Sequence, residues 1–234
     1  MLYHYLLVGL QELQLDTKQK LSEEELVHTL ESGMSKSDRK LLQELMLRPD
    51  DDKITAQLEA LKQQMEEDEQ PCVLSDEDLR WQLVYEQGTR SRNAFVRDWY
   101  TFNLALNNVM AAQICRKHGF DLKKAIVGEG PIQEALRTSK AKDFELSDQL
   151  EEIGDILRLS EIEDLYERER KTDALRWRWL EEHTLFHYYE VENVLAYYLM
   201  AKMLYRWDLL NVEEGQKVFR ALIADMKRDI RFDK

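Results

Sequence analysis

The sequence predicts an all-α protein, folded as a multihelical bundle, from three observations. Glycine and proline number only 8 and 3 among 234 residues, so the residues that most often form turns or interrupt helices are scarce. Charged residues make up 34% and hydrophobic residues 44%, a balance typical of amphipathic helices. Apolar residues also recur at helical spacing along most of the chain. A chain of this length can bury a hydrophobic core without disulfides.

Residues 1–74 are expected to form an amino-terminal helical layer. Residues 3–10 are apolar and aromatic without helical periodicity, which fits either a short strand or a first helical turn ending near Gly9. Ser22 and Glu25 have the spacing of a capping box. A helix is therefore predicted to begin at Glu23.

Two further helices are predicted in this layer. Residues 38–47 carry leucines at helical spacing and are followed by Pro49, which disfavours helix in the residue before it. Residues 54–70 are amphipathic, with one apolar stripe and an acidic remainder. The acidic stretch 66–78 then resembles a linker.

The main helical bundle is predicted over residues 75–234, although both parts could pack as a single domain. Ser75 is a candidate N-cap for its first helix. A stripe of large apolar side chains in the next helix predicts core: Phe95, Trp99, Phe102, Leu106 and Val109.

Short helices and loops are expected over residues 119–150, with a turn at 143–148. Residues 151–207 are expected to be nearly unbroken helix, divided if anywhere near residues 171 and 172. Asn211 and Glu214 have capping-box spacing and predict a final helix.

An internal similarity links residues 106–111 (LNNVMA) and 191–196 (VENVLA). Two related helical hairpins would explain it, and so would chance, because this pattern is common in helices.

Charge and cysteine content exclude several classes of function. The formal net charge is −13, which disfavours binding to a phosphate backbone. Cys72 and Cys115 lack the number and spacing of a disulfide framework or zinc site, so both are expected to be reduced. Residues 1–10 lack the features of a signal peptide, and no apolar segment is long enough to span a bilayer. We therefore expect a cytoplasmic protein.

His183, His187 and Glu190 are the only metal ligands that the sequence suggests. Their spacing would place them on one face of a helix, where they could chelate a divalent ion. However, Thr184 replaces the glutamate of a zinc protease motif, and the histidines continue an apolar stripe, which favours a packed histidine pair. No nucleophile motif or phosphate-binding loop occurs. We expect no catalytic residues, no cofactor and no small-molecule substrate.

Polar and aromatic residues of the predicted helices raise two further expectations. Asn103, Asn107 and Asn108 lie in an apolar helix and require hydrogen-bond partners. Arg90, Arg92 and Arg97 are expected to pair with the acidic segment 161–169. Late aromatic residues cover nearly all helix faces, as expected for core or for a subunit interface: Trp177, Trp179, Phe186, Tyr188, Tyr189, Tyr197, Tyr198, Tyr205 and Trp207.

Four segments together resemble an uncharacterised bacterial family whose genes lie among those for V-type ATPase subunits. They are residues 3–15 (YHYLLVGLQELQL), 95–112 (FVRDWYTFNLALNNVMAA), 136–146 (LRTSKAKDFEL) and the helical segment 161–207. Residues 192–202 (ENVLAYYLMAK) are also similar to helices of the V-type ATPase C or d subunit. That subunit has three related helical domains, and this chain is long enough for at most two.

The resemblance implies a non-catalytic accessory or central-stalk-like subunit of a bacterial V-type ATPase. Its partners would be other ATPase subunits, and the complex would hold it at the inner membrane. Candidate contact residues combine charge with nearby apolar stripes: Arg97, Glu163, Glu167, Arg168 and Arg170. The alternative is a metal-dependent helical-bundle enzyme that uses His183, His187 and Glu190.

Overall fold

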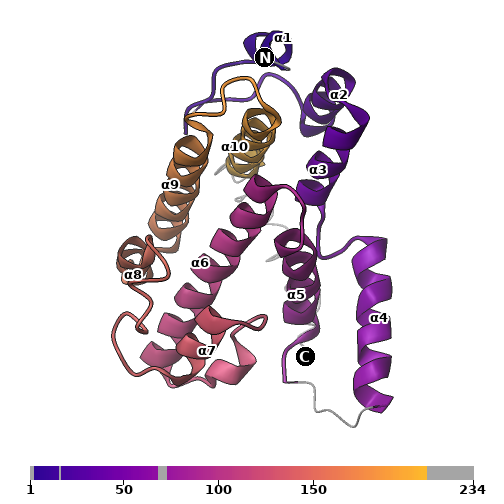
Figure 1. Cartoon of the computed structure of the whole chain (residues 1–234). Helices are drawn as coiled ribbons and strands as arrows, with labels where there is room; N and C mark the ends of the chain where they lie inside the picture. Colours follow the sequence, from indigo (N-terminus) through magenta and orange to yellow (C-terminus); the bar gives the residue numbers. More distant parts are fainter. Residues whose placement is uncertain (1–2, 16, 68–72, 210–234) are drawn as a thin grey trace, which may run out of the picture. The chain divides into compact units, whose positions relative to one another are not determined.

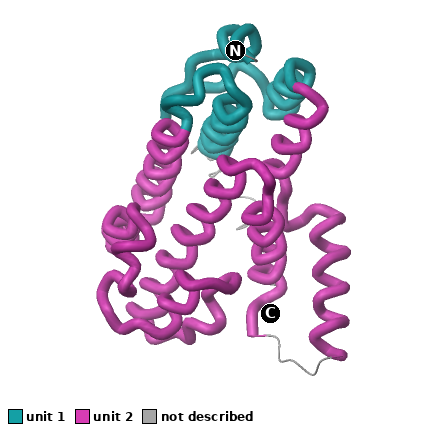
Figure 2. Tube along the Cα trace, viewed as in Figure 1, with its two compact units in different colours: residues 1–34, 184–234 teal, residues 35–183 magenta. Residues whose placement is uncertain are grey.

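The computed structural model describes residues 3–15, 17–67 and 73–209, and every regular element in these ranges is a helix (Figure 1). The predicted all-α, multihelical fold is confirmed. No helix of the described ranges is both long and apolar enough to cross a membrane. The contacts divide the chain into two compact units (Figure 2). Unit 1 comprises residues 1–34 and 184–234, and unit 2 comprises residues 35–183.

Unit 1 is formed by segments from both ends of the chain. Its helices are α1 (His4–Val8), α2 (Glu23–Gly33) and α10 (Val191–Leu209). Residues 4–8 are thus helical, which is the second of the two alternatives for this segment. The predicted capping box begins α2: the Ser22 hydroxyl accepts from the Glu25 N–H at 3.2 Å, and the Glu25 carboxylate accepts from the Ser22 N–H at 2.9 Å.

Tyrosines of α10 hold the segment between α1 and α2. The Tyr197 hydroxyl donates to the Gln11 carbonyl and the Tyr205 hydroxyl donates to the Leu21 carbonyl, both at 2.9 Å. Burial, with Tyr197 and acidic side chains nearby, raises the pKa of Tyr205 to about 12. The phenol is therefore protonated at neutral pH and can keep donating this hydrogen bond.

Unit 2 is built around α6 (Ala94–His118), which lies between α5 (Asp76–Thr89) and α8 (Ile153–Ser160) in Figure 1. The predicted stripe on α6 is buried throughout and confirmed as core. The other elements of unit 2 are α3 (Lys36–Met46), α4 (Asp52–Glu67), α5 (Asp76–Thr89), the 3-10 helix η1 (Leu122–Lys124), α7 (Pro131–Thr138), α8 (Ile153–Ser160) and all but the last residue of α9 (Leu165–Thr184).

The predicted division between residues 74 and 75 falls inside unit 2. Ser75 caps α5 as predicted, because its hydroxyl accepts from the Asp78 N–H. Across this position, α4 packs on α5. The Arg80 guanidinium of α5 donates to the Thr55 hydroxyl of α4 at 2.8 Å. Residues 35–67 therefore lie in the same compact unit as α5 and α6.

The asparagines of α6 have hydrogen-bond partners, as the sequence predicts. The Asn108 side chain donates to the Val127 carbonyl at 2.8 Å and accepts from the Val127 N–H at 2.9 Å. Asn107 donates to the Tyr85 hydroxyl at 2.6 Å. Paired in this way, the buried Asn108 amide positions the loop after η1 on α6, and the more exposed Asn107 amide positions α5.

A second polar network joins α6 to α9. The Arg176 guanidinium donates to the Oδ1 atoms of Asn103 at 2.9 Å and Asn107 at 3.3 Å. It also pairs with Asp173 at 3.0 Å, and the Asp173 side chain is only 2% exposed. This arrangement satisfies a charged pair in the core with several hydrogen bonds.

The two long helices α6 and α9 run antiparallel. The ring of Trp179, near the end of α9, stacks on Phe102 and lies against Phe95, near the start of α6. At the opposite ends, Lys117 pairs with Glu163 at 3.9 Å. The start of α6 therefore lies far from the acidic segment 161–169, which leads into α9 and includes its first turn.

The expected pairing of Arg90, Arg92 and Arg97 with residues 161–169 is thus wrong. Arg90 pairs with Glu86, and Arg97 pairs with the adjacent Asp98 at 3.7 Å. The antiparallel arrangement separates these arginines from the acidic segment, and local carboxylates serve instead.

The expected helix division near residues 171 and 172 is also wrong, because α9 runs through both positions. The predicted helix over residues 151–207 breaks instead at residues 161–164, between α8 and α9, and at residues 185–190, between α9 and α10. The predicted final helix at Asn211 and Glu214 lies outside the described residues. The similar segments LNNVMA and VENVLA lie in the middle of α6 and at the start of α10, and their common origin stays a prediction.

The contact between α8 and α9 predicts a pH-dependent stability. The Asp155 carboxylate accepts from Arg178 and from Arg158, and these bonds lower its pKa, Arg178 most strongly. The stabilisation is complete above the unfolded pKa of about 3.9 and is lost as the pH falls through the lower folded value.

We therefore expect Asp155→Asn to lower the unfolding free energy of unit 2 by about 1 kcal/mol near pH 7. The difference from wild type should shrink as the pH falls below about 4. Urea unfolding between pH 7 and pH 3 measures both effects. Glu163→Gln is the control, because this side chain is 89% exposed and should show a much smaller difference. A loss in Asp155→Asn that stays constant over this range would contradict the prediction.

A candidate partner-binding surface in unit 1

The loop of residues 185–190 between α9 and α10 is held in one conformation by several hydrogen bonds. The side chain of Asn193 donates to the carbonyls of Thr184 and His187. Tyr189 adopts a left-handed backbone conformation with φ of 62°, which is uncommon for a residue other than glycine. Its carbonyl accepts from the Tyr3 N–H at 3.0 Å. The loop is thereby attached to the residue that precedes α1.

Large apolar side chains on this loop and on α1 are exposed. Phe186 is 85% exposed, Tyr188 is 67% exposed and Tyr5 of α1 is 92% exposed. The His4 ring connects the two segments, because it contacts both the Tyr5 ring at 5.4 Å and the Tyr189 ring at 4.5 Å. We call the exposed group the aromatic surface; it comprises Tyr5, Val8, Leu185, Phe186 and Tyr188.

Side chains of this kind are typical of protein interfaces. Aromatic residues are enriched at the centres of interfaces and carry much of their binding energy. Grouped exposed apolar side chains mark interaction sites more often than scattered ones do. The hydrogen-bonded loop also reduces the conformational entropy that binding would otherwise remove. The aromatic surface therefore has both the composition and the preorganisation of a contact site.

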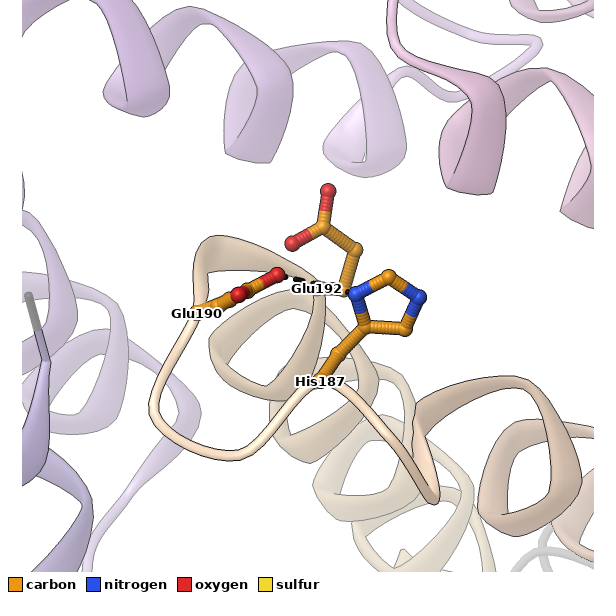
Figure 3. Close-up of side chains that lie close together, drawn as sticks. All are labelled: His187, Glu190 and Glu192. Carbon is orange, nitrogen blue, oxygen red and sulfur yellow. Dashed lines mark hydrogen bonds and ion pairs between the residues drawn. The ribbon is translucent and has the colours of Figure 1, made fainter. Parts of the chain in front are cut away.

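A cluster of possible metal ligands lies on the same loop and the start of α10. One ligand atom each from His187, Glu190 and Glu192 lies within 4.8 Å of the others (Figure 3). The Nδ1 atom of His187 is 2.9 Å from the Glu190 carboxylate, in a hydrogen bond. Bound zinc requires ligand atoms about 2.0–2.2 Å away, so small side-chain movements would be needed. The His187 and Glu190 side chains are about half exposed, and solvent can compete with them.

The structure brings together two of the three predicted metal ligands and leaves out His183. The His183 ring stacks on Trp179, with 3.7 Å between the ring centroids, and its Nδ1 atom lies 2.9 Å from the Trp179 carbonyl. The expected packed pair of histidines does not form, because α9 ends at Thr184 and leaves His187 on the loop. Both histidines are exposed.

The five predicted partner-contact residues lie in unit 2 at two separate places. Arg97 lies near the start of α6 and also donates to the Ser91 carbonyl. The others lie just before α9 or in its first two turns: Glu163, Glu167, Arg168 and Arg170. Within this second group, Glu167 pairs with Lys171 one turn away at 2.7 Å, and Glu163 pairs with Lys117 of α6 at 3.9 Å.

The late aromatic residues divide between core and surface. Trp177, Trp179 and Tyr198 are buried, in agreement with the core interpretation. Phe186 and Tyr188 are exposed because the chain leaves the helix at Thr184. Tyr5 was not among the expected contact residues. The sequence of the loop contains no glycine or proline to signal a break.

The sequence model of the family described as protein of unknown function (DUF2764) matches residues 55–230, which is more than half of the chain. The chain belongs to the DUF2764 family. The match includes the loop of residues 185–190 and α10, and thus most of the aromatic surface. No match was found among curated proteins or among solved structures. The expected membership of an uncharacterised family is confirmed.

Proposed function

We propose that this DUF2764 protein is a non-catalytic accessory subunit of a bacterial V-type ATPase and acts through protein–protein contacts. The observation that carries the proposal is the aromatic surface on a hydrogen-bonded loop. Exposed aromatic side chains lose unfavourable contact with water when a partner covers them. The surface therefore suits a protein partner.

The resemblance of four segments to a family encoded with V-type ATPase subunits supports the choice of partner. The similarity of residues 192–202 to the C or d subunit concerns α10, the helix that directly follows the loop. On this proposal the protein resides in the cytoplasm and is held at the inner membrane by the complex. Arg97 would make secondary contacts with the partner. So would the charged residues at the start of α9, which are Glu163, Glu167, Arg168 and Arg170.

Removal of the aromatic surface should weaken assembly. We expect the double variant Phe186→Ser and Tyr188→Ser to recover at least about 10-fold less of the V-type ATPase subunits, because truncated interface aromatics commonly cost about 2 kcal/mol or more. Affinity capture of the tagged chain from native membranes, followed by identification of the bound chains, measures this.

Phe120→Ser is the matched control, because Phe120 is also an exposed aromatic, at 64%, but lies in unit 2. It should leave capture unchanged. Recovery of no ATPase subunit with the wild-type chain would refute the proposed partner. Equal recovery with the double variant would refute the role of the aromatic surface.

The competing function is a metal-dependent enzyme. The cluster of His187, Glu190 and Glu192 allows a specific test of it. Elemental analysis of the purified chain separates the two functions. Stoichiometric zinc or iron that is lost in His187→Ala would favour the enzyme. Absence of bound metal, together with specific capture of ATPase subunits, would favour the accessory subunit.

A further inference from the structure

A groove of about 400 Å³ lies between α8 and α9 of unit 2. These helices are neighbours at the left of Figure 1 and are joined by the ion pair between Arg178 and Asp155. Two stripes with spacing i, i+3, i+4 and i+7 line the groove. One comprises Asp155, Arg158, Leu159 and Ile162, and the other comprises Lys171, Ala174, Leu175 and Arg178.

The centre of the groove is apolar. Leu159 and Leu175 are 8% and 6% exposed, and Ile162 and Ala174 are partly exposed beside them. Apolar positions of α8, of Ile162 just after α8, and of α9 leave a channel suited to the apolar stripe of a further helix.

Three cationic side chains lie along the edges of the groove. Side chains of Arg158, Lys171 and Arg178 are 75%, 56% and 49% exposed. Asp155 is the one carboxylate in the lining, and both arginines share it. Just outside the lining, Glu167 pairs with Lys171, and Glu182 lies 3.9 Å from Arg178. The lining itself thus has more positive than negative charge, on a chain whose net charge is −13.

We propose that the groove between α8 and α9 binds an acidic amphipathic helix of a partner protein. Apolar side chains of this helix would cover the partly exposed Ile162 and Ala174, beside the buried Leu159 and Leu175. Its flanking carboxylates would pair with Arg158 and Lys171. Formation of charge-assisted hydrogen bonds at both edges would orient the helix along the groove.

An acidic protein segment fits better than a polyanionic surface. A membrane or nucleic acid would bring many phosphates against the remaining negative charge of the chain. A single helix places only a few carboxylates, all at the edges of the groove. The inference concerns unit 2 and depends neither on the aromatic surface nor on the V-type ATPase assignment.

A labelled peptide of about four helical turns, with a leucine stripe and flanking glutamates, tests the proposal against the full-length chain. The matched control peptide has lysine in place of each glutamate. Fluorescence anisotropy should show binding of the acidic peptide that weakens as salt is added. The lysine peptide should bind at least about 10-fold more weakly.

Two variants of the groove should separate its charge from its shape. Lys171→Glu reverses an edge charge and should weaken binding about 5–10-fold. Ala174→Glu fills the centre and should abolish binding. Lys62→Glu is the control, because Lys62 lies on α4, away from α8 in Figure 1, and also loses one exposed ion pair, with Asp76. Circular dichroism checks that each variant is folded.

Several results would overturn the proposal. Equal affinity for the glutamate and lysine peptides would remove the charge argument, and equal affinity of Lys171→Glu and Lys62→Glu would place the site elsewhere. Displacement of the peptide by inorganic phosphate alone would assign the groove to a small anion. A concentration-dependent dimer that Lys171→Glu abolishes would assign it to a second copy of the chain. Lys171→Glu remains decisive if Ala174→Glu does not fold.

Discussion

Arg176→Met is expected to lower the free energy of unfolding of unit 2 by about 3 kcal/mol. The substitution removes the ion pair with Asp173 and the hydrogen bonds to Asn103 and Asn107, while the methionine replaces most of the apolar stem. Loss of one partner from a buried pair costs about 3–5 kcal/mol, because the remaining charge keeps its desolvation penalty. The Arg176 side chain is 16% exposed, so the lower end of this range applies.

The double variant Arg176→Met and Asp173→Leu separates the charge from the packing. Removal of both charges should recover about 1–2 kcal/mol of the loss, since buried pairs can often be replaced by apolar residues. Urea unfolding followed by tryptophan fluorescence measures this, because Trp99 and Trp179 lie in the same core. A single variant that loses less than about 1 kcal/mol would show that the network contributes little to stability.

Gly88→Ala is expected to destabilise unit 2 by about 2 kcal/mol or more. A Cβ atom on Gly88 of α5 would lie 2.1 Å from the ring of Tyr100 on α6. Tyr100 is buried, and its hydroxyl donates to the Glu44 carbonyl at 2.7 Å, so the ring cannot move aside easily. Alanine favours the helix by about 1 kcal/mol, but the overlap between helices outweighs this gain.

Gly154→Ala in α8 is the matched control. An added Cβ there meets no atom within 4 Å, so we expect a gain of about 0.5–1 kcal/mol from helix propensity. The two substitutions should therefore shift the urea midpoint in opposite directions. A neutral Gly88→Ala would mean that α5 and α6 can separate without loss of packing.

Local chemistry made several elements predictable from the sequence. Ser22 and Ser75 cap helices with their own side chains, and the partner of each is the N–H three residues later. The stripe of α6 was predictable because a 3.6-residue period places its members on one face wherever the helix packs. In each case the determining atoms lie within a few turns of one another.

The aromatic surface was not predictable, because its loop depends on contacts distant in sequence. No glycine or proline marks the break after Thr184. The loop instead depends on the Asn193 side chain and on the bond from Tyr3 to Tyr189. The sequence predicted either core or a subunit interface for these aromatic residues, and the loop after Thr184 leaves Phe186 and Tyr188 exposed.

Helical segments, their caps and the apolar face of α6 follow from the amino-acid sequence alone, since short-range hydrogen bonds and helical periodicity encode them. Tertiary structure decided which segments share a unit, where Arg176 finds its partners, and which aromatic side chains remain exposed. It also decided that the stripes of α8 and α9 face a common groove. These features depend on residues far apart in the chain, whose proximity arises only when the helices pack.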